Sequence, residues 1–140
     1  MKTKYVVDIS NQIGALSDVL PSDVGSALFV EAEKIITDSQ INYVPVVTGD
    51  LKRSGMVELP EYTRNKIKVV CGFGSNTVEY AAAVHEAAPA VGQGRRKYLS
   101  LPFQVAVPKL AANMGITIRN RIESRKIIKG GTKSKWVWSA

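Results

Sequence analysis

Two segments in the first third of the chain carry apolar residues at helical spacing. The first lies in residues 8–20 and is predicted to end at Pro21, because proline does not continue a helix. A second helix is predicted to open at Ser22 or Asp23 and to run to about Gln40. The apolar positions are Ile9, Ile13, Leu16 and Leu20 in the first helix and Val24, Ala27, Leu28, Ala32, Ile35 and Ile36 in the second. The charged residues of the second helix fall mostly on its other face: Glu31, Glu33, Lys34 and Asp38.

The stretch from Tyr43 to Gly55 predicts a joint between helix and strands. Pro45 forbids continuation of a helix and biases the residue before it toward extended backbone. Gly49 can adopt backbone angles that other residues resist, and residues 49–54 then predict one short helical turn. The chain is therefore expected to change here from helix to sheet.

A hairpin is predicted after the joint. Residues 56–59 form its first strand, residues 60–65 its turn, and residues 66–74 the return strand. Cys71 sits where a small buried residue fits, which favours a structural role. Residues 76–86 suit either a helix or a strand, and three consecutive alanines favour a short helix.

The last third of the chain predicts a loop, a long helix and an arm. Residues 87–98 lack periodicity and predict a long loop. Pro102 suits the first turn of the final helix, and Pro108 predicts a kink in it or a later start. Gly130 and Gly131 are expected to end any helix before the tail. The apolar stripe of the final helix is Phe103, Val107, Leu110, Met114, Ile118 and Ile122.

Together these elements predict one α+β domain over residues 1–125 and an arm over residues 126–140. The domain has N-terminal helices, a small antiparallel sheet built on the hairpin and a long C-terminal helix. The arm is expected to be extended, so that Trp136 and Trp138 share one face. Two tryptophans need a pocket on the same chain, on a neighbouring subunit or on another protein.

The positive charge of the chain is concentrated in its second half. Residues 1–70 carry 8 Lys/Arg and 9 Asp/Glu, net −1, whereas residues 71–140 carry 11 Lys/Arg and 3 Asp/Glu, net +8. This asymmetry indicates a polyanion or an acidic surface as partner, or simply a solvated basic tail. No apolar run approaches the length of a membrane span or follows the basic start as in a signal peptide, and the single cysteine favours a reducing cytoplasm.

Candidate catalytic chemistry is sparse. His85 and Glu86 are adjacent, and neighbouring residues on a helix point in different directions. Cys71 with His85 is a conceivable nucleophile pair for a hydrolase, although nothing local indicates activation. There is no second histidine for a zinc site, and neither Gly72-Phe73-Gly74 nor Gly92-Gln93-Gly94 continues into a phosphate-binding loop. The sequence thus predicts no enzyme, no catalytic or metal-binding residue and no cofactor.

Nucleic-acid binding is a second possibility. Arg95, Arg96 and Lys97 precede Tyr98, and residues 119–138 are cationic with tryptophans among them. No recognition-helix arrangement accompanies these cations. The expectation is therefore a module that contacts phosphates without reading sequence.

The order of the motifs resembles that of a known family. A helical first third precedes Val44-Pro45-Val46-Val47-Thr48-Gly49-Asp50-Leu51-Lys52-Arg53-Ser54 and a hairpin. Tyr80-Ala81-Ala82-Ala83-Val84-His85-Glu86 follows, then Lys97-Tyr98-Leu99 and a helix opened by Pro102. Over roughly residues 8–124 this pattern resembles the neck, or tail-completion, proteins of tailed bacteriophages, which are head–tail connectors. Lys52 departs from the arginine common there, and the arm after Arg125 lies outside the motifs.

The resemblance implies a structural virion protein, assembled in the host cytoplasm, that forms a ring at the head–tail junction. Such a ring, a hexamer or dodecamer, contacts the portal or adaptor and the tail tube or tail terminator, and DNA passes through it. It implies transient contact with DNA, no membrane and no cofactor. The residues expected at interfaces with subunits or partners are Asp50, Lys52, Arg53, Trp136 and Trp138, and those expected to face the lumen or DNA are Arg95, Arg96 and Lys97.

Overall fold

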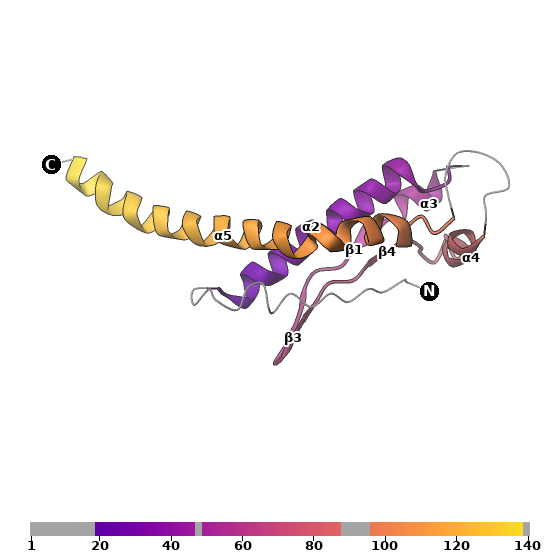
Figure 1. Cartoon of the computed structure of the whole chain (residues 1–140), viewed down its shortest axis with the longest axis horizontal. Helices are drawn as coiled ribbons and strands as arrows, with labels where there is room; N and C mark the ends of the chain where they lie inside the picture. The colour runs from indigo at the N-terminus through magenta and orange to yellow at the C-terminus, as the bar shows by residue number, and fades with distance from the viewer. Residues whose placement is uncertain (1–18, 47–48, 88–95, 139–140) are drawn as a thin grey trace.

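A computed structural model describes residues 19–46, 49–87 and 96–138, with side chains described as far as Arg125. The fold is α+β, as predicted: four helices and two small antiparallel sheets occupy the described residues. Two of the helices are long, and they cross each other with the hairpin to one side (Figure 1). Residues 8–18 of the helix predicted over residues 8–20 lie outside the described residues, and its last two residues, Val19 and Leu20, are not helical.

The helix α2, Pro21–Asn42, confirms the second predicted helix and extends it by one turn or less. Pro21 occupies the first turn, where a backbone N–H has no acceptor within the helix, so proline's lack of an N–H loses no hydrogen bond there. Asp23 caps the start through its carboxylate, which accepts the Leu20 N–H at 2.9 Å. The expectation that Glu31 lies on the exposed face is wrong, because Glu31 is buried and bonds Lys34 and Asn113.

The joint contains the short helix α3, Asp50–Arg53, as predicted. Gly49 precedes it with φ of 84°, in the left-handed region that favours glycine. Leu51 points inward and belongs to the same buried cluster as Val44. The turn is thus fixed by one apolar side chain while its charged residues stay outside.

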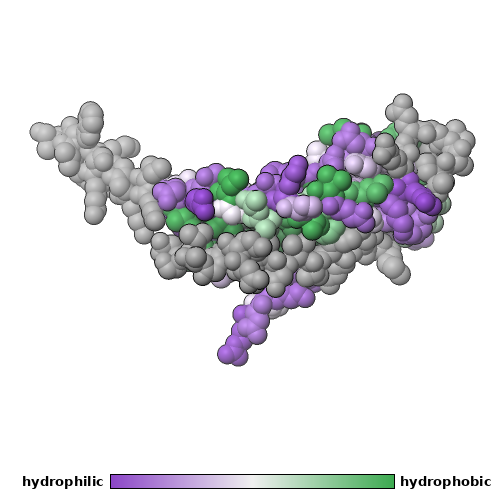
Figure 2. Space-filling view, in the orientation of Figure 1, coloured by the Kyte–Doolittle hydropathy of each residue, from purple (hydrophilic) through white to green (hydrophobic). Residues whose placement is uncertain are grey.

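The hairpin has four short strands that form two antiparallel pairs. The inner pair is β1, Met56–Val57, with β4, Cys71–Gly72, and the outer pair is β2, Glu61–Thr63, with β3, Lys66–Lys68. The prediction of a turn over residues 60–65 is therefore wrong for its first part: Pro60 only interrupts pairing, and β2 follows it. The tip projects from the body and is hydrophilic (Figures 1 and 2). Tyr62 lies against Gly25 of α2, where no side chain is in its way.

The helix α4, Ala81–Glu86, confirms the short helix predicted there, and α5, Ser100–Trp138, is longer than expected. α5 continues through Pro108 and through Gly130–Gly131, and Figure 1 shows it curving without a break. The prediction of an extended arm is wrong, because glycine weakens a helix by only about 1 kcal/mol per residue and does not forbid it. The backbone is helical as far as Trp138, so the strand that was expected to place Trp136 and Trp138 on one face is not formed.

The core consists of two neighbouring clusters of buried residues. One joins the C-terminal half of α2, the joint, β4, α4 and the start of α5. The other joins the N-terminal half of α2 to the middle of α5, where Met114 and Ile118 are fully buried. The predicted stripe of α5 is confirmed from Leu110 to Ile122. Val107 is exposed instead, because the face that α5 buries shifts from Phe103 and Ala106 to that stripe.

Gly115 offers a simple test of the helix in which it lies. A Cβ added at this position would meet no atom within 4 Å other than the local helix backbone. Gly115→Ala is therefore expected to raise the free energy of unfolding by about 0.5–1 kcal/mol, because alanine loses less backbone entropy in a helix. Urea titration followed by circular dichroism measures the change. A destabilised variant would mean that this part of α5 is not helical.

Candidate functional site

The charged turn of the joint stays on the surface. Asp50 and Arg53 are exposed and form an ion pair with each other. The backbone carbonyl of Lys52 accepts a hydrogen bond from Gln40 Nε2 at 2.8 Å, which ties the turn to α2. Three of the five predicted interface residues therefore lie on this turn, with Asp50 and Arg53 exposed and Lys52 half-buried. What they contact stays a prediction.

Behind the turn, Ser54 links the joint to the sheet. Its hydroxyl donates to the Leu51 carbonyl at 2.7 Å and accepts the Gly74 N–H at 3.0 Å. The Ser at the end of the Thr-Gly-Asp-Leu-Lys-Arg-Ser motif thus has a structural use. It holds the end of the return strand against the turn.

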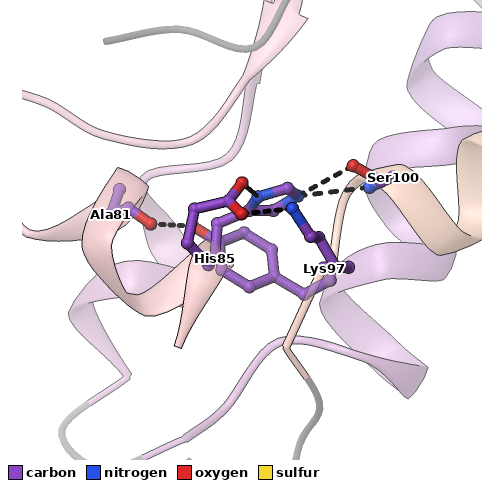
Figure 3. A network of polar contacts seen from close by, with 6 residues as sticks. Ala81, His85, Lys97 and Ser100 are labelled. Atoms are coloured by element: carbon purple, nitrogen blue, oxygen red, sulfur yellow. Dashed lines mark hydrogen bonds and ion pairs between the residues drawn. The ribbon is translucent and has the colours of Figure 1, made fainter. Parts of the chain in front are cut away.

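A second polar group connects α4 to the start of α5 through His85 (Figure 3). The Ser100 backbone N–H donates to His85 Nε2 at 3.4 Å, and the Ser100 hydroxyl lies 3.1 Å from the same nitrogen. Because Nε2 accepts, the ring proton sits on Nδ1 and is donated to Glu86 Oε1 at 3.0 Å. The expectation that His85 and Glu86 point apart is wrong: the two side chains bond directly.

Lys97, eleven residues after Glu86, completes this group. Its ammonium pairs with Glu86 Oε2, and its backbone N–H donates to the His85 carbonyl at 2.6 Å. The hydrogen bond from Lys97, then that from His85, lowers the pKa of the Glu86 carboxyl below its usual value. The residues just before and just after the segment 88–95, which lies outside the described residues, are therefore tied to each other.

Tyr98 lies under this polar group and is buried. Its hydroxyl donates to the Ala81 carbonyl at 2.6 Å, and its own carbonyl accepts the Ser39 hydroxyl at 2.6 Å. The ring meets His85 and Phe73 edge-on, with centroids 5.0 and 5.2 Å apart. Burial raises the pKa of the Tyr98 phenol, so the hydroxyl stays a donor. Tyr98, just before α5, thus contacts Ser39 of α2, Ala81 and His85 of α4, and Phe73, which follows β4.

The order Glu86, His85, Ser100 matches the atom sequence of a Ser–His–carboxylate triad. Two features argue against catalysis here. His85 is only 5% exposed, and the Ser100 backbone N–H already donates to the Nε2 lone pair that a base would use. We interpret the group as a structural link between α4 and α5, and a catalytic role for these residues is not expected.

Cys71 is not an activated nucleophile. It is buried in β4, and burial raises the pKa of its thiol to about 11. A thiol with that pKa is protonated at neutral pH and reacts slowly.

Native protein is therefore expected to resist alkylation of Cys71 by iodoacetamide at pH 7.5, whereas protein unfolded in urea is expected to react fully. Mass spectrometry counts the adducts. Rapid labelling of the native chain would instead indicate a reactive thiol and favour a hydrolase that uses Cys71.

A third charged group, which the sequence analysis did not predict, joins the first turn of α2 to α5. Asp23 is fully buried, and it accepts hydrogen bonds from Arg125 Nη1 at 2.6 Å, Arg125 Nη2 at 2.9 Å and Arg121 Nε at 3.1 Å. The bonds from Arg125 hold the pKa of the Asp23 carboxyl well below its usual range, against the effect of burial. Asp23 was expected only as a helix cap, and nothing near it in the sequence indicates an arginine partner.

The predicted basic groups are only partly available. Lys97 is engaged by Glu86, and Arg121 and Arg125 by Asp23, whereas Arg96 and Arg119 are exposed. Arg95 and the side chains of Trp136 and Trp138 lie outside what the structure describes. Three of the described cations are therefore already paired within the chain.

Comparisons with protein-family models, curated proteins and solved structures find no match to this chain. Among the described residues, no cluster of histidine, cysteine and acidic side chains could hold a metal ion. No helix in the same part of the chain is long and apolar enough to cross a membrane.

Proposed function

We propose that this chain is a structural subunit of a tailed-phage particle that forms a ring at the head–tail junction. The observation that carries the proposal is where the family-like motifs lie. Val44 and Leu51 come from the first motif, Ala81 from the second and Tyr98 and Leu99 from the third, and all five are buried in one cluster. The motifs thus hold a scaffold together instead of lining a reactive cleft.

The polar residues of the motifs support the same function. Ser54, His85 and Tyr98 each bond a different element, so the joint, α4 and the start of α5 are fixed relative to one another. A subunit of a ring needs such rigidity, because each interface must repeat the same angle for the ring to close. The turn of Asp50, Lys52 and Arg53, in which Asp50 and Arg53 are exposed, is held by this scaffold and would contact a neighbour.

The experiment combines assembly with location in the particle. Purified protein is imaged by negative-stain microscopy and weighed by mass photometry, alone and with isolated heads or tails. Rings, or attachment to heads or tails, are the expected results. A monomer that joins neither would overturn the proposal.

A non-sequence-specific nucleic-acid-binding module is the second candidate, supported by the net charge of +8 in residues 71–140. Three of the described cations, Lys97, Arg121 and Arg125, pair with the carboxylates of Glu86 and Asp23, which makes them less available to phosphates. Binding to duplex DNA that weakens steeply with salt would favour it. Absence of binding at low salt would exclude it.

A further inference from the structure

The helix α5 has apolar residues on the side away from the core. Val105 is 61% exposed and Ile116 is 58% exposed, with the exposed Ala112 between them. Eleven residues make about three helical turns, so these positions share one face. The face is opposite the stripe of Leu110, Met114 and Ile118, and a surface helix is normally polar there. Figure 2 shows hydrophobic surface among polar surface along the course of α5.

The outward side of α2 has apolar residues at the same spacing. Val30 is 38% exposed and Ile41 is 69% exposed, and the exposed Thr37 lies between them as Ala112 does on α5. Val30 and Ile41 line a shallow groove of about 490 Å³ along this helix. Both outer faces therefore have two branched aliphatic residues three turns apart with a small residue between.

The charges beside the two faces are of opposite sign. Glu33 and Asp38 line the groove on α2, where the one cation, Lys34, is paired with Glu31. Lys109 and Arg119 are exposed on α5 within one turn of Ala112 or Ile116. Charged rims of opposite sign favour one orientation of contact and disfavour contact of either face with itself.

We propose that the face of Val105, Ala112 and Ile116 on one copy of the chain packs into the α2 groove between Val30 and Ile41 on a second copy. The contact joins two different faces, so it is heterologous and repeats from copy to copy, giving a closed ring or a filament. The inference rests on the proposed function for the closure of the ring. It adds which faces make the contact.

The test uses two exposed residues, one on each face, replaced by the same charge. Wild-type protein is expected to self-associate with rising concentration in sedimentation velocity. Ile116→Arg and Ile41→Arg are each expected to lower the association constant by about 30-fold or more, as for a central interface residue. Leu59→Arg, which changes an exposed aliphatic residue on the hairpin, is the matched control and is expected to leave association unchanged.

Mixing the two variants identifies the kind of contact. Each variant keeps one intact face, and the two intact faces match, so an equimolar mixture is expected to form heterodimers and nothing larger. Normal assembly of either variant overturns the proposal, as does a wild-type chain that stays monomeric at the highest soluble concentration. Unimpaired self-association of Ile41→Arg also overturns it, because α5 would then pair with α5.

The outcomes separate this inference from the proposed function. Self-association through these two faces in a protein that joins neither heads nor tails would leave the inference standing and remove the phage role. If Ile116→Arg and Ile41→Arg both assemble normally and also enter phage particles, this inference is removed and the proposed function stands. Circular dichroism and thermal unfolding confirm that each variant folds, which is expected because both replaced side chains are exposed.

Discussion

Asp23→Ala is expected to lower the free energy of unfolding by about 2–3 kcal/mol, because it leaves two arginines without their shared carboxylate. Removing one partner of a fully buried pair has a larger effect, but the side chains of Arg121 and Arg125 are 45% and 37% exposed, so water can replace part of what they lose. The variant also loses the hydrogen bond to the Leu20 N–H at the start of α2. Urea unfolding at pH 7 measures the change.

The pH dependence of stability gives a second readout of the same group. The pKa of Asp23 is depressed in the folded chain, so its contribution is complete above the carboxyl pKa of the unfolded chain, 3.8. It is lost as the pH falls from there toward the folded pKa. Asp23→Asn, which cannot ionise, should therefore remove part of the loss of stability between neutral and acid pH.

Controls separate this effect from a general loss of surface charge. Asp50→Asn removes a carboxylate from an exposed ion pair, and such pairs contribute about 0–1 kcal/mol. Arg125→Ala should approach the effect of Asp23→Ala, and the double variant should be less destabilised than the sum of the two. Additive effects would mean that Asp23 and Arg125 do not interact in solution.

The sequence predicts the helices well because their signal is local. The apolar residues of α2 and of α5 from Leu110 to Ile122 repeat with the helical period, and this period alone predicts that each helix has an apolar face to bury. Gly49 and the short turn after it are equally local. Each of these predictions needs no knowledge of what lies elsewhere in the chain.

The errors arise where a local signal competes with a distant contact. Asp23 reads as a helix cap, and it is one, yet its arginine partner lies 102 residues away. Glu31 falls on the polar side of a helical wheel but is covered by Asn113 of α5. Pro60 suggests a turn, although the strands resume pairing beyond it. The polar links through Ser54, His85 and Tyr98 likewise join elements whose distance in space the sequence does not show.

The outward apolar faces differ from these errors, because their signal is in the sequence. Val105, Ala112 and Ile116 recur at helical spacing as regularly as the buried stripe does. One helix then carries two apolar faces, and only the structure shows which of them α2 covers. The second apolar face is exposed, which is the physical reason to propose a second packing partner for it.

Tyr98→Ala is expected to have the largest effect of any single substitution considered, a loss of about 3–5 kcal/mol in the free energy of unfolding. The side chain is among the largest that the fold buries completely, and Phe73 and His85 both pack against its ring. Removing it leaves a cavity where the start of α5 meets α4 and β4. The Ala81 carbonyl also loses its donor.

Tyr98→Phe divides that effect into its two parts. Phenylalanine keeps the ring contacts and removes only the hydroxyl, so a loss of about 1–2 kcal/mol is expected for the unpaired Ala81 carbonyl. Both values are measured by urea unfolding, with Tyr62→Phe on the exposed hairpin as the matched control, for which little change is expected. If the buried ring is what fixes α5 to α4, Tyr98→Phe should still assemble like the wild type. Tyr98→Ala should unfold before assembly can be tested. A Tyr98→Phe variant as unstable as Tyr98→Ala would instead mean that the hydrogen bond of the hydroxyl supplies the stabilisation. The polar link between α4 and α5, and not the packing of the Tyr98 ring, would then hold the motifs together.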